Sequence, residues 1–157
     1  LDFRRQYLKE ERLRRQLDKI EEVSGWKNRR KNEGYGVAIT ECFKTTVGQV
    51  VKVSKGTDGK VKIDHVWAVI DCGWYVNPDT IKAQVEGSVI MALGAATMHE
   101  ITFKDGMTEQ RNFYDYQMPR IYDMPQIDVH IMENDADAGG VRTRVAAVCT
   151  GARQCDF

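Results

Sequence analysis

The segment Ala83-Gln84-Val85-Glu86-Gly87 brings an amide, a carboxylate and a glycine together within about one helical turn. A glutamine amide both donates and accepts hydrogen bonds, so it suits the mixed polar edge of a bound molecule. The glycine leaves room for such a molecule to approach closely. Taken alone, however, the segment is better explained as the exposed polar face of a helix. Its interpretation therefore depends on the elements that surround it.

Cysteine and histidine, which often bind metals, do not occur in a metal-binding pattern in this sequence. The cysteines are Cys42, Cys72, Cys149 and Cys155, and the histidines are His65, His99 and His130. No two cysteines form a C-x-x-C pair, and no histidine stands at zinc-ligand spacing from a cysteine. We therefore predict free thiols, structural or surface histidines, and no metal ligand.

The composition is that of a neutral globular domain. The chain has 157 residues, of which 42% are hydrophobic, and its 23 Lys and Arg balance its 23 Asp and Glu. A net charge of zero gives no electrostatic reason to expect nucleic acid or an anionic membrane as a partner. No apolar run approaches the roughly 20 residues that a transmembrane segment needs. No signal peptide is visible, and because the chain starts at Leu1 its compartment stays open between cytoplasm and periplasm.

Residues 1–23 are predicted to form one amphipathic helix. Leu13, Leu17 and Ile20 recur at helical spacing, and charged side chains fill the other face. Ser24-Gly25 is a stop signal, because glycine accepts the left-handed conformation that ends helices. A polar, basic stretch follows, so residues 1–33 are interpreted as a helical segment with a linker.

From Tyr35 the apolar period changes to two, which predicts extended strands up to about Val53. Gly48 is expected to form a bulge in this stretch. Residues 56–59 (Gly-Thr-Asp-Gly) indicate a hairpin turn. Residues 66–70 (Val-Trp-Ala-Val-Ile) are apolar on both faces, so this strand is expected to be central and buried.

A long helix is predicted from Asn77 to about Met98. Asparagine caps free backbone N–H groups, and the Pro78 and Asp79 that follow suit the first helical turn. The side expected to be buried consists of Ile81, Val85, Val89, Leu93 and Ala96. The small residues expected to allow close packing are Gly87, Ala92, Gly94 and Ala95.

The last predicted elements are a hairpin around residues 104–107 and a strand over residues 127–131. The order is then helix, hairpin, helix, hairpin, strand. This order predicts an α+β fold with a mainly antiparallel sheet and one long packed helix.

Three stretches, taken in order, resemble one protein family. They are residues 68–73 (Ala-Val-Ile-Asp-Cys-Gly) with 76–79 (Val-Asn-Pro-Asp), residues 83–87, and residues 112–116 (Asn-Phe-Tyr-Asp-Tyr) with 119–120 and 124–130. Over about residues 34–141, this set resembles the C-terminal part of the molybdopterin-binding large subunit of xanthine dehydrogenase and aldehyde oxidase-type molybdenum hydroxylases. In particular, it is similar to the type represented by the isoquinoline 1-oxidoreductase beta subunit and related bacterial aldehyde dehydrogenases.

The resemblance implies part of the second molybdopterin-binding domain of that subunit. The cofactor would be a molybdenum–pyranopterin, in bacteria in its cytosine dinucleotide form. The reaction would be oxidation of an aldehyde or N-heterocycle with oxygen from water. The partners would be the rest of the large subunit and an iron–sulfur small subunit that carries [2Fe–2S] clusters.

The same resemblance assigns roles to single residues. Gln84 would reach the pterin–molybdenum group, Gly87 would leave room for it, and Glu86 is a further cofactor-binding candidate. Asp71 and Asn77 are instead expected to shape the turn between strand and helix.

After Val141 the sequence departs from the family pattern. The family continues with Gly-Glu-Pro-Gly, whose glutamate is the catalytic base, whereas this chain has Arg142-Thr143-Arg144. No carboxylate occupies the place of the base, so no catalytic residue is assigned and the chain alone is predicted to be inactive. Reading the tail codons one base further permits Glu-Pro-Gly, so residues 142–157 are interpreted as an aberrant tail from a frameshift. The coding DNA would test this hypothesis.

Two other interpretations stay open. The chain is either a catalytically dead fragment that packs against partner chains, or a structural or interaction module without a cofactor. A structure with no cleft beside Gln84 would favour the interaction module.

Overall fold

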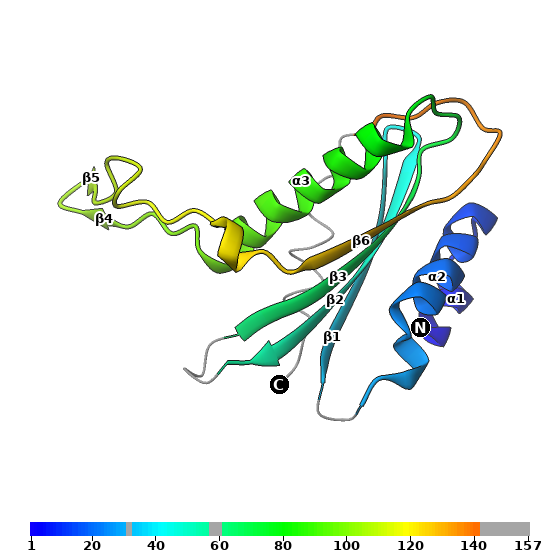
Figure 1. The fold of residues 1–157 in the computed structure, drawn as a ribbon, viewed down its shortest axis with the longest axis horizontal. Helices are drawn as coiled ribbons and strands as arrows, with labels where there is room; N and C mark the ends of the chain where they lie inside the picture. The colour runs from blue at the N-terminus through cyan, green and yellow to red at the C-terminus, as the bar shows by residue number, and fades with distance from the viewer. Residues whose placement is uncertain (31–32, 57–60, 142–157) are drawn as a thin grey trace.

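The computed structural model describes residues 1–30, 33–56 and 61–141. Its helices are α1 (Asp2–Tyr7), α2 (Glu11–Ser24) and α3 (Pro78–Thr97), and its 3-10 turns are η1 (Trp26–Asn28) and η2 (Ile121–Asp123). Its strands are β1 (Gly34–Cys42), β2 (Thr45–Lys55), β3 (Val61–Asp71), β4 (Phe103–Lys104), β5 (Met107–Thr108) and β6 (Gln126–Ile131). Figure 1 shows α3 on one side of the main sheet and α1 and α2 on the other.

Within the described residues, the main sheet has four strands in the order β1-β2-β3-β6. The pairs β1–β2 and β2–β3 are antiparallel, which confirms the predicted α+β fold with a mainly antiparallel sheet. The pair β3–β6 is parallel, which the sequence pattern did not indicate. A parallel pair needs a long crossover, and α3 with the segment that follows it provides one.

The strand β3 lies at the centre of the fold, with a helical layer on each face. Val66, Ala68 and Ile70 belong to the core beneath α3, and Val69 belongs to the core beneath α2. The predicted central, buried strand over residues 66–70 is therefore confirmed. The helix α2 also shares a core with the sheet. The predicted division of the chain into segments at residues 33 and 141 stays a prediction.

The helix α3 begins as predicted. The Oδ1 atom of Asn77 accepts hydrogen bonds from the backbone N–H of Asp79 at 2.9 Å and of Thr80 at 3.3 Å. The predicted buried side is confirmed through Leu93, but Ala96 is exposed. A β-carbon on Gly94 would lie 2.8 Å from Cγ of Pro119, so the segment after α3 packs against the end of this helix.

Residues 1–23 are mainly helical, as predicted, but the prediction of one continuous helix is wrong. The chain leaves helical conformation at Leu8, and α2 starts at Glu11. Arg5 binds the carboxylate of Glu21 at 2.6 Å, although a continuous helix would separate these two residues by about 24 Å. The break therefore lets α1 fold back beside α2, where Leu8 joins the same apolar core.

The predicted bulge at Gly48 is also wrong. Gly48 pairs in regular register with Ile39 and Val69, and the irregularity lies between Lys52 and Val53. A β-carbon on Gly48 would lie 3.4 Å from Cγ of Gln16, so the glycine allows α2 to approach the sheet closely. The predicted hairpin turn at residues 56–59 lies almost entirely outside the described residues.

The predicted hairpin at residues 104–107 is confirmed as β4 and β5, joined by Asp105 and Gly106 with φ of 51° and 76°. Two positive φ values in a two-residue loop match the turn that joins tightly paired strands. Figure 1 shows this hairpin at the tip of an arm that extends away from the sheet. Among the described helices, none combines the length and apolar character needed to span a bilayer.

The glycines of α3 provide a matched stability test. A β-carbon on Gly94 would lie 2.6 Å from Nε2 of His99 and 2.8 Å from Cγ of Pro119, whereas one on Gly87 would meet no atom within 4 Å. Overpacking costs about 1–3 kcal/mol, while glycine to alanine in an open helical position gains about 0.5–1 kcal/mol. Denaturant unfolding should show Gly94→Ala less stable, and Gly87→Ala more stable, than the wild type. Equal stabilities for the two variants would contradict this packing.

Candidate functional site

The loops that follow β3 and β6 meet at one end of the sheet, because these two strands run parallel. The backbone N–H of Gly139 donates to the carbonyl of Cys72 at 2.7 Å, and the N–H of Trp74 donates to the carbonyl of Ala136 at 2.9 Å. The carboxyl ends of parallel strands are a common place for ligand sites. The two loops therefore form a fixed edge at the position where such a site is expected.

A groove of about 340 Å³ opens between these loops and the first turns of α3. Its lining residues are Cys72, Trp74, Tyr75, Val76, Asn77, Thr80, Ile81, Gln84, Ala138, Gly139 and Val141. This volume is at the lower end of the range for small-molecule sites. The walls are mainly apolar, and the amides of Asn77 and Gln84 are the polar side chains best suited to orient a ligand.

The structure places Gln84 in the wall of this groove, while Glu86 and Gly87 do not line it. All three residues are exposed. Gln84 therefore lies at a cavity and is accessible to a ligand. Gly87 has an open surface in front of it, because nothing in the described chain packs there.

Two glycines hold the groove loops together at close range. Gly73 has a φ of 71°, and a β-carbon on it would lie 2.3 Å from the carbonyl oxygen of Asp137. A β-carbon on Gly139 would lie 2.3 Å from Oγ1 of Thr45. Only glycine fits at these two positions without moving backbone, so the shape of the groove depends on them.

Asp71, at the end of β3, is the most densely bonded polar group beside the groove. Its buried carboxylate accepts two hydrogen bonds from Arg12, at 2.8 and 2.7 Å, and one from Nδ2 of Asn134 at 3.1 Å. The N–H of Gly73 also donates to it, at 3.2 Å. We call Arg12, Asp71, Gly73 and Asn134 the Asp71 cluster. It joins α2 to both loops that line the groove.

The predicted role of Asp71 and Asn77 in the turn between strand and helix is confirmed, since Asp71 holds Gly73 and Asn77 caps α3. Burial alone would raise the pKa of Asp71. Hydrogen bonds from Arg12, Asn134 and Gly73 outweigh this effect and hold the pKa of the carboxyl below its ordinary value of 3.8. The carboxylate is therefore charged at neutral pH, and it balances the guanidinium of Arg12.

The thiol of Cys72 lines the groove but is poorly suited to act as a nucleophile. Burial raises the pKa of Cys72, which keeps the thiol protonated at neutral pH. Cys42 and Cys72 are free, as predicted, while Cys149 and Cys155 lie outside the described residues. No three His, Cys, Asp or Glu side chains in the described part of the chain lie close enough to hold a metal ion.

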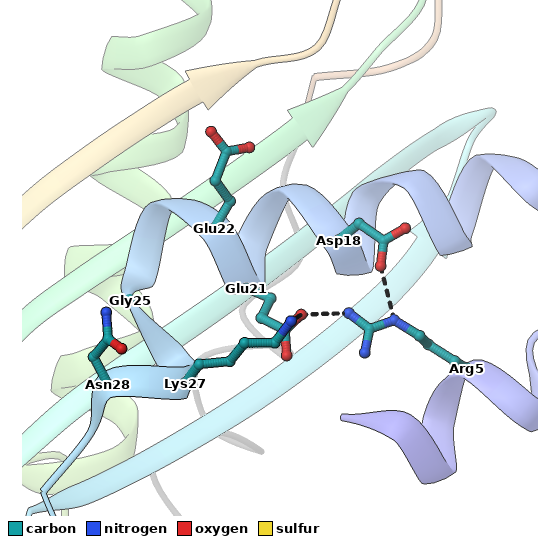
Figure 2. A pocket seen from close by; sticks show the side chains of 7 residues that line it. All are labelled: Arg5, Asp18, Glu21, Glu22, Gly25, Lys27 and Asn28. Carbon is teal, nitrogen blue, oxygen red and sulfur yellow. Dashed lines mark hydrogen bonds and ion pairs between the residues drawn. The ribbon is translucent and has the colours of Figure 1, made fainter.

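A second, more polar pocket lies between α1, α2 and η1 (Figure 2). Arg5 contacts Asp18 at 2.8 Å and Glu21 at 2.6 Å, and Lys27 also contacts Glu21, at 3.3 Å. These charges satisfy one another within the protein. These ion pairs therefore hold α1 against α2. The pocket is less suited to bind a ligand than the groove is.

Comparison with known proteins decides the family. The family model of the molybdopterin cofactor-binding domain matches residues 19–125, which include β3, α3 and Gln84. This chain belongs to that family.

Two curated relatives and one solved structure illustrate the similarity. The isoquinoline 1-oxidoreductase subunit beta of Brevundimonas diminuta is 33% identical over 78% of this chain and 16% of the relative. The nicotine 6-hydroxylase large subunit of Paenarthrobacter nicotinovorans is 29% identical over 54% of this chain and 11% of the relative. Quinoline 2-oxidoreductase from Pseudomonas putida 86 shares the fold with a TM-score of 0.63, at 21% identity over 69% of this chain and 15% of that one.

These figures confirm the predicted resemblance to large subunits of molybdenum hydroxylases. They also show that the chain spans only about a sixth of the isoquinoline 1-oxidoreductase subunit.

The sequence did not indicate the Asp71 cluster or the groove walls. Arg12 lies 59 positions before Asp71, among many other charged residues, so nothing local marks it as a partner. Trp74 and Val76 are 65% and 81% exposed. The signal available in the sequence was the presence of two large apolar residues in the short loop between a predicted buried strand and a helix cap.

The Asp71 cluster provides a test of how the groove is held. Arg12→Met leaves the buried Asp71 carboxylate without its counter-ion, which should lower the free energy of unfolding by about 3 kcal/mol at neutral pH. Asp71→Asn in the Arg12→Met background should recover more than half of this loss. The control is Lys19→Met on the same helix, whose exposed pair with Glu22 should contribute less than about 0.5 kcal/mol.

The pH dependence of the free energy of unfolding follows from the lowered pKa of Asp71. The wild-type contribution is present above pH 3.8 and is lost as the pH falls through the lower folded-state pKa of Asp71. In Arg12→Met, burial without the counter-ion raises that pKa. The stability difference between the two proteins should therefore shrink as the solution is acidified. A difference that stays constant down to pH 3 would rule out the ion pair as its source.

Proposed function

We propose that this chain is the cofactor-binding part of the large subunit of a molybdenum hydroxylase, and that Gln84 contacts the pterin of its cofactor. The observation that carries the proposal is the position of Gln84 in the wall of the groove, at the carboxyl ends of β3 and β6. When bound, the molybdenum cofactor supplies the oxidation of an aldehyde or N-heterocycle with oxygen from water.

The residues present fit this group. The amide of Gln84 matches the mixed donor and acceptor edge of a pterin. The open surface at Gly87, where no atom of the described chain lies within 4 Å of a β-carbon, leaves space one turn further along α3. The family match over residues 19–125 supports the same ligand. Glu86 is exposed on the same helix and is proposed as a further contact.

We further propose that the cofactor is the cytosine dinucleotide form, and that the assembled enzyme includes the rest of the large subunit and an iron–sulfur subunit with [2Fe–2S] clusters. The chain spans only 16% and 11% of two relatives, which supports the need for the rest of the large subunit. The dinucleotide form and the iron–sulfur subunit are proposed from membership of the family alone. The substrate would be an aldehyde or N-heterocycle. The chain alone is proposed to be inactive, because Arg142 and Thr143 occupy the position where the family has the glutamate that acts as the catalytic base. These two residues, and the frameshift proposed for residues 142–157, lie outside the described residues.

A chimera tests the cofactor role. Residues 12–141 of this chain replace the matching segment of the Brevundimonas relative, and the purified protein is analysed for molybdenum and pterin. We expect Gln84→Ala to lower pterin retention at least tenfold, because a hydrogen bond to the cofactor that contributes about 1.4 kcal/mol would be lost. Gly87→Ala should also lower retention, although it stabilises the helix. The control is Lys82→Ala. Lys82 lies two positions before Gln84 on α3, is exposed and does not line the groove.

The variant pair separates function from folding. A stability loss cannot explain weaker retention in Gly87→Ala, since that variant is expected to unfold at higher denaturant concentration. If Gln84→Ala and Gly87→Ala retain as much pterin as Lys82→Ala, Gln84 does not contact the cofactor. Absence of molybdenum and pterin from the unmutated chimera would instead favour the alternative of a module without cofactor.

The tail provides a second, independent prediction. A chimera whose segment from this chain ends at residue 141 continues with the relative's own sequence, where the family pattern has its glutamate, and one that continues through residue 157 replaces that segment. Both should retain cofactor, but the longer chimera should oxidise isoquinoline at least a hundredfold more slowly, because a general base contributes about 10²–10⁴-fold. Equal turnover in both chimeras would refute the proposed inactivity of the natural chain.

A further inference from the structure

The loop between β3 and α3 carries a tryptophan that does not belong to the buried core. Trp74 is 65% exposed, although its backbone N–H is fixed by the carbonyl of Ala136 at 2.9 Å. The preceding Gly73 is held by Asp71 and has no room for a side chain. The loop is therefore rigid at the position where it presents a large aromatic side chain to solvent.

The other two tryptophans have aromatic neighbours. Trp26 lies edge-on to Tyr35 with ring centroids 6.0 Å apart, and Trp67 stacks on His65 with centroids 3.9 Å apart. Among the described residues, no aromatic ring stacks on Trp74. An exposed, fixed and unstacked indole in the wall of a groove is a surface that a planar ligand can cover.

The rest of the groove selects among planar ligands. Val76, which is 81% exposed, and Ile81 add apolar wall, while Gln84 adds an amide that both donates and accepts. No charged side chain lines the groove in the described part of the chain, so it does not favour an anion through an ion pair. An uncharged aromatic ring with nitrogen atoms at its edge satisfies both the apolar walls and the amide.

We infer that Trp74 is the stacking wall for a planar N-heterocycle held in the groove, with Gln84 at the edge of the ring. The inference rests on the proposed function and deepens it, because it names the ring-binding residue and the class of ligand. Two molecules offer this chemistry: the pterin of the cofactor, and an aza-aromatic substrate of the kind named for the isoquinoline, nicotine and quinoline relatives.

The test uses the full chain labelled with ¹⁵N, whose three indole N–H signals are assigned with one tryptophan-to-phenylalanine variant each. The uncharged 6-hydroxymethylpterin and isoquinoline are titrated separately. A saturable shift of the Trp74 signal is expected, while the signals of Trp26 and Trp67 stay in place and serve as internal controls. A response to the pterin alone identifies the cofactor as the source of the ring, and a response to isoquinoline alone identifies the substrate.

Two variants then measure the contact. Stacking on an aromatic side chain changes affinity by about tenfold to a hundredfold on truncation, so Trp74→Ala should bind at least tenfold more weakly. Trp74→Phe should lie between Trp74→Ala and the wild type. Because Trp74 is exposed, both variants should keep the far-ultraviolet circular dichroism of the wild type.

The inference is overturned if neither ligand moves the Trp74 signal, or if Trp74→Ala binds as tightly as the wild type. Its failure is distinct from failure of the proposed function. If the chimera still requires Gln84 to retain pterin while Trp74 does not respond, only the stacking role is lost. If the chimera also retains pterin independently of Gln84, the proposed function falls as well.

Discussion

The bidentate ion pair between Arg12 and the buried carboxylate of Asp71 holds the functional edge of this domain together. Arg12 comes from the helical layer on one face of the sheet, and Asp71 ends the central strand. The same carboxylate binds Gly73 and Asn134, which start the two loops of the groove. A buried charge is tolerated only when its partners are complete. The arrangement therefore couples the packing of α2 to the geometry of the groove on the other side of the strand.

This coupling explains why the groove is open and rigid at once. Its inner side is fixed by the Asp71 cluster, by the bond from Gly139 to Cys72, and by glycines where backbones approach too closely for a side chain. Its outer side consists of Trp74, Val76 and Gln84, which are exposed. Apolar side chains that line one exposed groove together often mark a surface that meets a ligand or a partner. Rigid support beneath an exposed surface is what a site for a bulky, planar cofactor requires.

The elements set by local chemistry were predictable from the sequence. The cap at Asn77, the turn at Asp105 and Gly106, and the apolar strand over residues 66–70 depend on nearest neighbours and on period. The elements set by distant contacts were not predictable. The break in the first helix depends on Arg5 meeting Glu21, and the parallel pairing of β6 depends on the path of the crossover. Gly48 seemed to mark a bulge, whereas it makes room for Gln16.

For the site, the family resemblance led to Gln84 and the structure added its surroundings. Periodicity alone would have left this residue as a polar position on a helix. The direct test of the account is a crystal structure of the cofactor-loaded chimera, with anomalous diffraction measured at the molybdenum edge. The account predicts the metal beyond the open face of α3, with the pterin ring within hydrogen-bond distance of the Gln84 amide. A pterin located elsewhere, with the groove filled by protein side chains, would contradict it.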